Sequence, residues 1–380
     1  MIRLCRTLFA APLLCAFATT AVALPIPQPP NLPADSYILV AHDSGQILAA
    51  SNPDKRHEPA SITKIMTAYI VFDEIASGNI SLDDKVTISE KAWRMGGSKM
   101  FIEVGKQISV KNLLHGMITS SGNDATVALA EYLAGSVTAF AEYMNQYAAK
   151  LGLEGSHFVN ATGWPAPGHY MTARDIATLS IDLIDKFPKL YHLFFEQKKF
   201  TWNGIEQYNR NSLLWTEEGV DGIKTGHTKE AGYCLVTSAK RADMRLVSVV
   251  LGTASDNARK SASAALLNYG FRFFDTHKLF DADTAITRVR VWKGAEQMLP
   301  ITAQGAVYVT APRGRADDLT TTAKLPARII APVKKGKKLG TLQVRREGQV
   351  LNNIPLYAGK TIAAGGMLRS MIDEFWLLFQ

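Results

Sequence analysis

The chain has 380 residues, of which 47% are hydrophobic and 20% are charged. This composition excludes a disordered or fibrous protein, and the length is sufficient for one large hydrophobic core or two smaller ones, so we expect two domains. The formal net charge of +8 at pH 7 is spread along the chain, and no basic run is interleaved with aromatic residues. We therefore expect no binding to nucleic acid, whereas the mild positive charge suits an anionic surface or carboxylate ligands.

The N-terminus has the pattern of a secretory signal peptide. Arg3 and Arg6 precede an apolar run over residues 8–18, and Ala-Val-Ala at residues 21–23 is typical of a cleavage site. We predict a signal peptide over residues 1–23, because the apolar run is too short for a permanent span. Its removal takes both arginines away and lowers the net charge from +8 to +6.

Removal of that segment also leaves Cys234 as the remaining one of three cysteines. A mature chain with a single cysteine cannot form an intramolecular disulfide. An exported protein of this size without a disulfide framework is typical of a bacterial envelope enzyme rather than of a small secreted module.

Residues 24–281 combine strand and helix patterns. Stretches typical of strands, "SYILVAHDSGQILAAS" and "GYCLVTSAKRADMRLVSVVLGTA", flank a long helical section such as "SGNDATVALAEYLAGSVTAFAEYMNQYAAKLG", where apolar residues recur every three or four positions. Strands from both ends of such a segment can form one antiparallel sheet with helices packed on it. This part is therefore predicted to be one α+β domain.

Residues 282–360 have a different pattern, with short alternating strands separated by Gly, Pro and Lys, as in "TRVRVWKG" and "KLGTLQVRREGQVLNNIPLYAG". This pattern predicts a small all-β domain. The lysine-rich "PVKKGKKLG" within it is expected to cross an exposed turn as a solvated run of charge.

Residues 361–380 end in "GGMLRSMIDEFWLLFQ", which has the pattern of an amphipathic helix. Its apolar face would carry Met367, Leu368, Met371, Ile372, Phe375, Leu378 and Phe379, and its polar face Arg369, Ser370, Asp373 and Glu374. Such a helix reaches roughly 20 Å, less than the roughly 30 Å of a bilayer core, so we expect it to lie in a membrane interface without spanning it. The alternative is that it packs on the β-rich domain of the same chain.

The stretch "ASITKIMTAYIV" places a hydroxyl and an amine on one side of an otherwise apolar helix. Ser61 and Lys64 are three positions apart, so their side chains are neighbours on the helix surface. An S-x-x-K pattern alone is common, and the simpler interpretation is a helix start with a surface lysine. Only other motifs in the chain can decide between the two.

Two further motifs follow. In "TSSGNDATVALA", Ser121 and Asn123 stand in a polar turn before an apolar helix, where an ordinary N-cap would also place them. In "GVDGIKTGHTKEAGYCLVTSAKR", the sequence Lys224-Thr225-Gly226 enters a strand, where an exposed turn lysine is the simpler interpretation. The order S-x-x-K, S-x-N, K-T-G is nevertheless improbable by chance, and it is typical of penicillin-binding proteins and class A β-lactamases.

The chain resembles the D-alanyl-D-alanine carboxypeptidase family of low-molecular-mass penicillin-binding proteins. The resemblance also includes "SHFVNATGWPAPGHYMTARDIATLS", "NRNSLLW", "DGIKTGHTKEAGY" and "LLNYGFRFFD", and it covers essentially the whole mature chain. It implies a domain of the serine β-lactamase/DD-peptidase type over residues 24–281. One segment, "KAWRMGGSKMFIEVGKQIS", is compact compared with the family pattern, so we expect the loop bordering the site to differ in shape.

The resemblance implies roles for the motif residues in acyl transfer. Ser61 would be the nucleophile, and Lys64 would take its proton, which requires a pKa depressed from about 10.4 by burial and a nearby cation such as Lys224. Ser121 would pass the proton to the leaving amine. Asn123 would hold Lys64 and the substrate amide in register.

The same resemblance implies how the substrate is held. The backbone N–H groups of the nucleophile and of His227 would form the oxyanion hole, and Gly226 would let substrate lie close to the strand edge. Lys224 and Thr225 would bind the terminal carboxylate of D-Ala-D-Ala or of a β-lactam. Arg210 is a further candidate for that anion, and a structural ion pair is its alternative role.

Other classes lack their signatures. The sequence has no G-x-S-x-G, no H-E-x-x-H and no metal-ligand spacing among its eight histidines, so we expect neither metal nor cofactor. His169 is interpreted as a structural residue. The sequence also lacks the E-x-x-L-N segment that a class A β-lactamase would need.

We expect a periplasmic serine carboxypeptidase that acts on peptidoglycan pentapeptide and is inhibited by β-lactams. We also expect it to be attached to the inner membrane. The alternatives are a DD-endopeptidase and a catalytically weak penicillin-binding wall protein.

Overall fold

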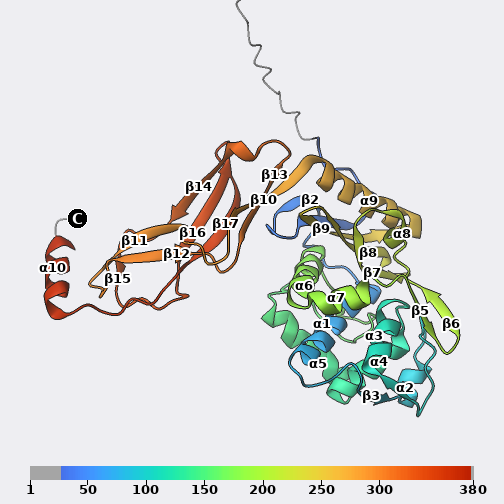
Figure 1. Cartoon of the computed structure of the whole chain (residues 1–380). Coiled ribbons are helices and arrows are strands. Elements are labelled where there is room, and N and C mark those ends of the chain that lie inside the picture. The colour runs from blue at the N-terminus through green and yellow to red at the C-terminus, as the bar shows by residue number, and fades with distance from the viewer. Residues whose placement is uncertain (1–26, 378–380) are drawn as a thin grey trace, which may run out of the picture.

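A five-stranded antiparallel sheet with the strand order β2-β1-β9-β8-β7 organises the larger domain. The computed structural model describes residues 27–377, and Figure 1 shows this domain at the right. The first strand of the chain pairs with β9, so strands from both ends of the predicted α+β segment meet in one sheet. The strands are β1 (Ser36–Ala41), β2 (Ile47–Ser51), β7 (Val220–Thr228), β8 (Gly232–Arg241) and β9 (Met244–Thr253).

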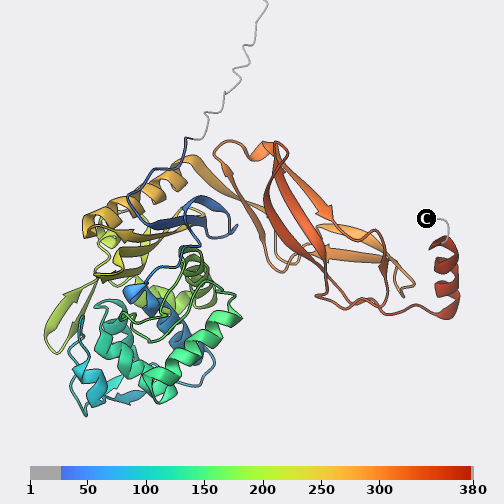
Figure 2. The same cartoon turned by 180° about the vertical axis from the view of Figure 1, so that it is seen from behind.

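Helices cover both faces of this sheet, which explains why β1 and β9 are apolar and buried almost throughout. On one face lies α9 (Asp256–Phe273), which packs against Leu39 and Leu246. On the other face lies a lobe of helices, and Figures 1 and 2 show the lobe and α9 on opposite sides of the sheet. The lobe contains α1 (Lys64–Ala76), α2 (Glu90–Arg94), α3 (Val110–Ile118), α4 (Asn123–Ala134), α5 (Val137–Lys150), α6 (Ala173–Lys186) and α7 (Pro188–Phe195).

Most of the longer helices begin at a side-chain cap. Ser136, Thr172 and Ser255 each accept a hydrogen bond of 3.1 Å from the backbone N–H three residues later, at the starts of α5, α6 and α9. Such a cap contributes about 1 kcal/mol to helix stability. The remaining short elements are the 3₁₀ turn η1 (Ala60–Thr63), α8 (Leu213–Thr216) and two hairpins, β3 (Lys85–Thr87) with β4 (Gln107–Ser109) and β5 (Lys199–Trp202) with β6 (Ile205–Tyr208).

The smaller domain consists of β-strands around a separate core that includes Val291, Leu299 and Leu356. A six-stranded sheet has the order β14-β16-β17-β12-β11-β15, and β10, which follows α9 directly, pairs with β13. Pairing within this domain thus begins before residue 282. The strands are β10 (Phe274–Phe280), β11 (Thr287–Trp292), β12 (Met298–Thr302), β13 (Val307–Pro312), β14 (Leu319–Lys324), β15 (Ile329–Ile330), β16 (Lys338–Arg346) and β17 (Gln349–Ala358), with a 3₁₀ turn, η2 (Ala316–Asp318), before β14.

Polar contacts join the two domains at the turn between β1 and β2. The carbonyl of Ser44 accepts a hydrogen bond of 2.8 Å from Asn352, and the side chain of Gln46 accepts one of 2.5 Å from the backbone N–H of Thr310. A third bond of 2.8 Å runs from Arg313 to the carbonyl of Phe271 at the end of α9.

The chain ends in α10 (Met367–Leu377), which lies at the end of the β-rich domain farthest from the larger domain (Figure 1). Asp373 on its polar face is buried and accepts hydrogen bonds from Arg290 (3.0 Å) and from the backbone N–H of Lys293 (2.7 Å). The apolar residues Met367, Leu368, Met371 and Ile372 are 51–83% exposed, so they are not buried against the β-rich domain.

The predicted fold class is confirmed: an antiparallel sheet with helices packed on it, then a β-rich domain and a C-terminal helix. The "PVKKGKKLG" lysines are exposed in the turn before β16 and at its first residue, as predicted. Cys234 is buried and free. None of the helices within residues 27–377 has the length and apolar character needed to cross a bilayer. The predicted signal peptide and the last three residues lie outside the described part of the chain.

Candidate active site

The structure brings Ser61 and Lys64 together as their spacing predicts. Ser61 lies in η1 and Lys64 opens α1, and the Nζ of Lys64 is 2.8 Å from the Oγ of Ser61. Lys64 is only 1% exposed, so it is not the surface lysine of the simpler interpretation. Its Nζ also donates to the Oδ1 of Asn123 and to the carbonyl oxygen of Thr162, both at 2.8 Å.

Two glycines allow η1 to fit between neighbouring segments. A Cβ on Gly163, whose φ is +79°, would lie 1.7 Å from the carbonyl oxygen of Ala60. A Cβ on Gly226 would lie 2.8 Å from the carbonyl oxygen of Pro59. Gly226 therefore lets β7 approach η1. Both close contacts fix the backbone next to Ser61.

Ser121 and Lys224 form a second hydroxyl-amine pair. The Nζ of Lys224 donates to the Oγ of Ser121 at 2.9 Å, and both side chains are buried. Ser121 has a φ of +59°, a left-handed conformation that costs about 1–2 kcal/mol for a residue with a Cβ. It does not cap α4, since Gly122 is the N-cap residue there and no side chain makes the cap bond. The simple N-cap interpretation of this motif is therefore wrong.

Asn123 connects the first pair to the loop at the rim of the site. Besides accepting from Lys64, its Nδ2 donates to the carbonyl of Gly96 at 2.9 Å, and its backbone N–H donates to Ser98 at 2.7 Å. The next residue, Asp124, is buried and accepts from the backbone N–H groups of residues 100, 101 and 102. The start of α4 thus holds the segment that we predicted to differ in shape.

The site concentrates positive charge in a dry environment. Burial, followed by the charge of Arg210, lowers the pKa of Lys64 to about 7. Burial also holds the pKa of Lys224 well below its usual range, with added repulsion from Lys64, Arg210 and Arg259. An amine that is neutral near pH 7 can act as a base, and the remaining cations favour an anionic ligand.

Arg210 lies at the exposed side of this cluster. Within residues 27–377 its guanidinium makes no ion pair, so the structural ion pair that was its alternative role is absent there. Thr225 is buried next to Lys224 on β7. His227 is exposed and its ring contacts that of Tyr233, with 4.0 Å between the centroids and 33° between the planes.

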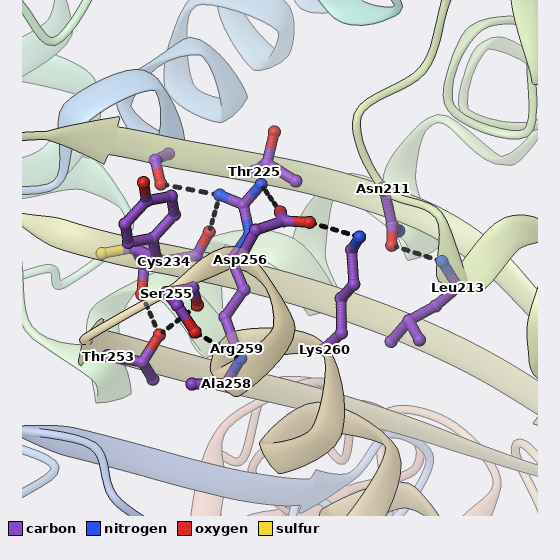
Figure 3. Close-up of polar contacts among 12 residues, drawn as sticks. Asn211, Leu213, Thr225, Cys234, Thr253, Ser255, Asp256, Ala258, Arg259 and Lys260 are labelled. Carbon is purple, nitrogen blue, oxygen red and sulfur yellow. Dashed lines mark hydrogen bonds and ion pairs between the residues drawn. The ribbon is translucent and has the colours of Figure 1, made fainter.

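Arg259 is a residue that sequence reasoning missed. Figure 3 shows its guanidinium extending from the first turn of α9 to the carbonyl oxygens of two sheet strands. It donates to Gly226 at 3.0 Å and to Cys234 at 3.2 Å, and it pairs with Asp256 at 2.5 Å. No motif spacing points to it, and its burial depends on the packing of α9 on the sheet, for which the sequence carries no local signal.

A cavity of about 290 Å³ opens beside the first pair. It is lined by Ser61, Gly97, Ser98, Asn123, Thr162, Gly163, Trp164, Pro165, His227 and Thr228. A larger cavity of about 720 Å³ lies near the junction of the domains, where Arg241, Arg272 and Arg313 line it, and it contains none of the predicted site residues. The chemistry therefore belongs to the smaller cavity.

His169 has the structural role expected of it. Its Nδ1 accepts from the backbone N–H of Val159 at 3.0 Å, so its Nε2–H is the donor to the Oγ1 of Thr63 at 2.8 Å. Burial lowers the pKa of His169 to about 4, which keeps the ring neutral.

One cluster in the described chain resembles a metal site. His192, Glu196 and Asp221 bring ligand atoms within 4.8 Å of one another. Asp221, however, is already held by Arg245 at 2.6 Å and by the hydroxyl of Tyr191 at 3.1 Å. We assign no metal to this cluster.

The packing of Gly163 on Ala60 generates a prediction. Both Gly163→Ala and Gly168→Ala force a left-handed backbone on alanine, since φ is +79° and +82°, but a Cβ at 168 has its nearest neighbour at 4.0 Å. We expect Gly168→Ala to lower the free energy of unfolding by about 1 kcal/mol, and Gly163→Ala by about 3 kcal/mol or more, because overlap adds to strain. Urea unfolding of both variants measures this difference. Equal losses would mean that the loop relaxes away from Ala60.

Family models and individual relatives point to the same family. Residues 24–255 match the D-alanyl-D-alanine carboxypeptidase family, and residues 274–364 match the C-terminal domain of penicillin-binding protein 5. D-alanyl-D-alanine carboxypeptidase DacC of Escherichia coli K12 is 41% identical over 372 residues, which are 96% of this chain and 93% of that protein. DacA of the same strain is 40% identical over 362 residues, 93% of this chain and 90% of that protein.

A solved structure agrees with these relatives. Penicillin-binding protein 5 from Haemophilus influenzae matches with a TM-score of 0.84 and 39% identity, covering 88% of this chain and 99% of that chain. The resemblance inferred from the motifs is confirmed, as is the DD-peptidase type of the larger domain. The chain belongs to the D-alanyl-D-alanine carboxypeptidase family.

Proposed function

We propose that this protein is a serine carboxypeptidase that removes the terminal D-alanine from the pentapeptide of peptidoglycan through an acyl-enzyme on Ser61. The observation that carries this proposal is the 2.8 Å contact between Ser61 and a buried Lys64 whose pKa is about 7. A serine hydroxyl is a weak nucleophile until a neighbouring base takes its proton, and this lysine is placed to do so.

The three contacts of the Lys64 amine suit the neutral form. A neutral amine has two N–H bonds and one lone pair. The oxygens of Asn123 and Thr162 are acceptors only, so they take the two N–H bonds. The lone pair then faces the hydroxyl of Ser61, which donates its proton to Nζ as Oγ attacks the carbonyl carbon of the penultimate D-alanine.

The negative charge on the carbonyl oxygen needs fixed donors. The backbone N–H groups of Ser61 and His227 serve as the oxyanion hole, a contribution typically of about 3 to 4 kcal/mol per donor. Both residues line the cavity of about 290 Å³. Among the strands of residues 27–377, β7 is the last of its sheet, so its outer edge can pair with the backbone of a bound peptide.

The leaving group departs on the side of the second pair. When the C–N bond breaks, the amine of D-alanine takes a proton from the hydroxyl of Ser121, whose Oγ is hydrogen-bonded to Lys224 at 2.9 Å. Ser121 regains a proton from the Lys64 ammonium, so Lys64 is neutral again before water attacks. The free carboxylate of that D-alanine is held by Lys224, Thr225 and Arg210, with Arg259 adding positive charge behind β7. Water then attacks the ester carbonyl, and the proton it loses returns to the Oγ of Ser61 by way of Lys64.

The substrate assay is the direct test of this function. We expect the protein to release D-alanine from pentapeptide faster than it cleaves a cross-linked dimer, and to be labelled covalently by penicillin at Ser61 with slow hydrolysis, because the opened ring stays tethered. Faster cleavage of the dimer would indicate the endopeptidase. Labelling without turnover of either peptide would indicate a catalytically weak penicillin-binding protein, and rapid penicillin turnover a β-lactamase.

The pKa of Lys64 generates a pH prediction. Lys64 is neutral above its pKa of about 7, so acylation by penicillin is expected to fall about tenfold per pH unit below that value. Ser61→Ala should abolish labelling at every pH. Lys64→Arg should abolish it near neutrality, because a guanidinium stays protonated. The measurement is the rate of penicillin labelling of the wild type and both variants from about pH 5 to about pH 9.

The matched control for the pH experiment is Lys150→Arg, an exposed lysine on α5. It should follow the wild-type profile. Near-normal labelling by Lys64→Arg would mean that Lys64 supplies only charge, and Lys224 acting through Ser121 would be the next base to test.

We also propose that the protein is exported to the periplasm and attached to the inner membrane through α10. The signal-peptide pattern of residues 1–23 supports export. The exposed apolar side chains of α10 support attachment in the interface, because its polar face is the one that contacts the β-rich domain.

Removal of the tail tests the attachment. A chain truncated after Gly359 is expected to leave the membrane fraction, and so is the double variant Leu368→Asp, Ile372→Asp, because charges on the apolar face oppose insertion. Glu374→Gln on the polar face is the control and should stay bound. Penicillin labelling confirms that the larger domain of each variant is folded. Full retention of the truncated chain in membranes would refute the anchor.

A further inference from the structure

An exposed tryptophan stands at the mouth of the candidate active site. Trp164 is 48% exposed and lines the same cavity as Ser61. With Pro165 it supplies the large apolar surface of a lining that otherwise consists of small or polar residues and His227. An apolar ring of this kind beside a nucleophile points to a ligand that covers it.

The indole is held in place before any ligand binds. Its ring carbons lie 3.5 Å and 3.1 Å from the positions that a Cβ would take on Gly96 and Gly97, so the ring packs on the backbone of these two glycines. Asn160 fixes the backbone of Trp164. Its Oδ1 accepts from the backbone N–H of Trp164 at 3.1 Å, and its Nδ2 donates to the carbonyl oxygen of Trp164 at 2.8 Å. A preorganised ring loses little entropy when a ligand packs on it.

The direction of the substrate decides which part of it meets this ring. The leaving D-alanine and its carboxylate lie toward Ser121 and Lys224, which are buried at the inner end of the site. The acyl portion of the peptide must extend the other way from Ser61. That direction leads into the cavity that Trp164 and His227 line.

We propose that Trp164 and Pro165 form an acyl-side subsite that binds the aliphatic part of the side chain preceding the two D-alanines. This subsite rests on the proposed carboxypeptidase function and deepens it. It would make Trp164 a specificity-determining residue, because a side chain with several methylenes gains apolar contact that glycine at the same position lacks.

A competing role for Trp164 is purely structural. The ring packs on Gly96, whose carbonyl accepts from Asn123, so its loss could disturb the contacts of Lys64. A structural role would reduce the rate for every substrate alike. A subsite would reduce it only for peptides whose side chain reaches the ring.

The test compares two peptides that are identical at the cleaved bond, diacetyl-L-lysyl-D-alanyl-D-alanine and acetyl-glycyl-D-alanyl-D-alanine. The readout is the ratio of their kcat/KM values for D-alanine release, in which the fraction of folded enzyme cancels. We expect the wild type to prefer the lysyl peptide by roughly tenfold or more, Trp164→Ala to lose most of that preference, and Trp164→Phe to keep most of it.

Trp215→Ala provides the control. Trp215 is similarly exposed, at 44%, but it lies on α8 and outside the lining of the cavity, so the ratio should stay at the wild-type value. Equal losses on both peptides in Trp164→Ala, or a wild type that does not distinguish them, would overturn the subsite while leaving the carboxypeptidase in place. Failure of the wild type to release D-alanine from either peptide would instead overturn the proposed function, and the subsite with it.

Discussion

The burial of two lysine amines in one site is the constraint on which the rest of the structure depends. A buried ammonium without compensation is costly, and Lys64 and Lys224 are 1% and 3% exposed in the same site. Each amine therefore has hydrogen-bond partners: Ser61, Asn123 and Thr162 for Lys64, and Ser121 for Lys224. Burial first, and neighbouring cations second, lower the pKa values of both amines, and a lowered pKa is the property that a base in acyl transfer requires.

Segments distant in the chain must meet for this to happen. Lys64 comes from α1, Asn123 from the start of α4, Thr162 from the loop before α6, and Lys224 from the edge strand β7. The contacts of Gly163 and Gly226 with the backbone before Ser61 hold η1 between that loop and that strand. The sheet and the helical lobe thus act on the site mainly through close backbone packing, which leaves little freedom for the nucleophile to shift.

Parts of this arrangement follow from local pattern and other parts do not. The neighbourhood of Ser61 and Lys64 follows from helical spacing, and the strands at both ends of the larger domain follow from their apolar runs. Thr162 contributes a backbone carbonyl, which every residue possesses, so its residue type does not indicate that it contacts Lys64. Arg259 reaches the site only because α9 packs on the sheet, and β10 joins the second domain by pairing with a strand far along the chain. Such long-range packing has no local signature.

Asn123 is shared between the base and the rim, and this has a thermodynamic consequence. One end of its amide accepts from Lys64 and the other donates to Gly96, in the loop on which the indole of Trp164 rests. A ligand that orders this loop and a change in the protonation of the base therefore act on one side chain. Their effects are coupled, and coupling between two binding equilibria is reciprocal. If a ligand bound at the rim shifts the pKa of the Lys64 amine, protonation of that amine must change the affinity for the ligand by the same free energy.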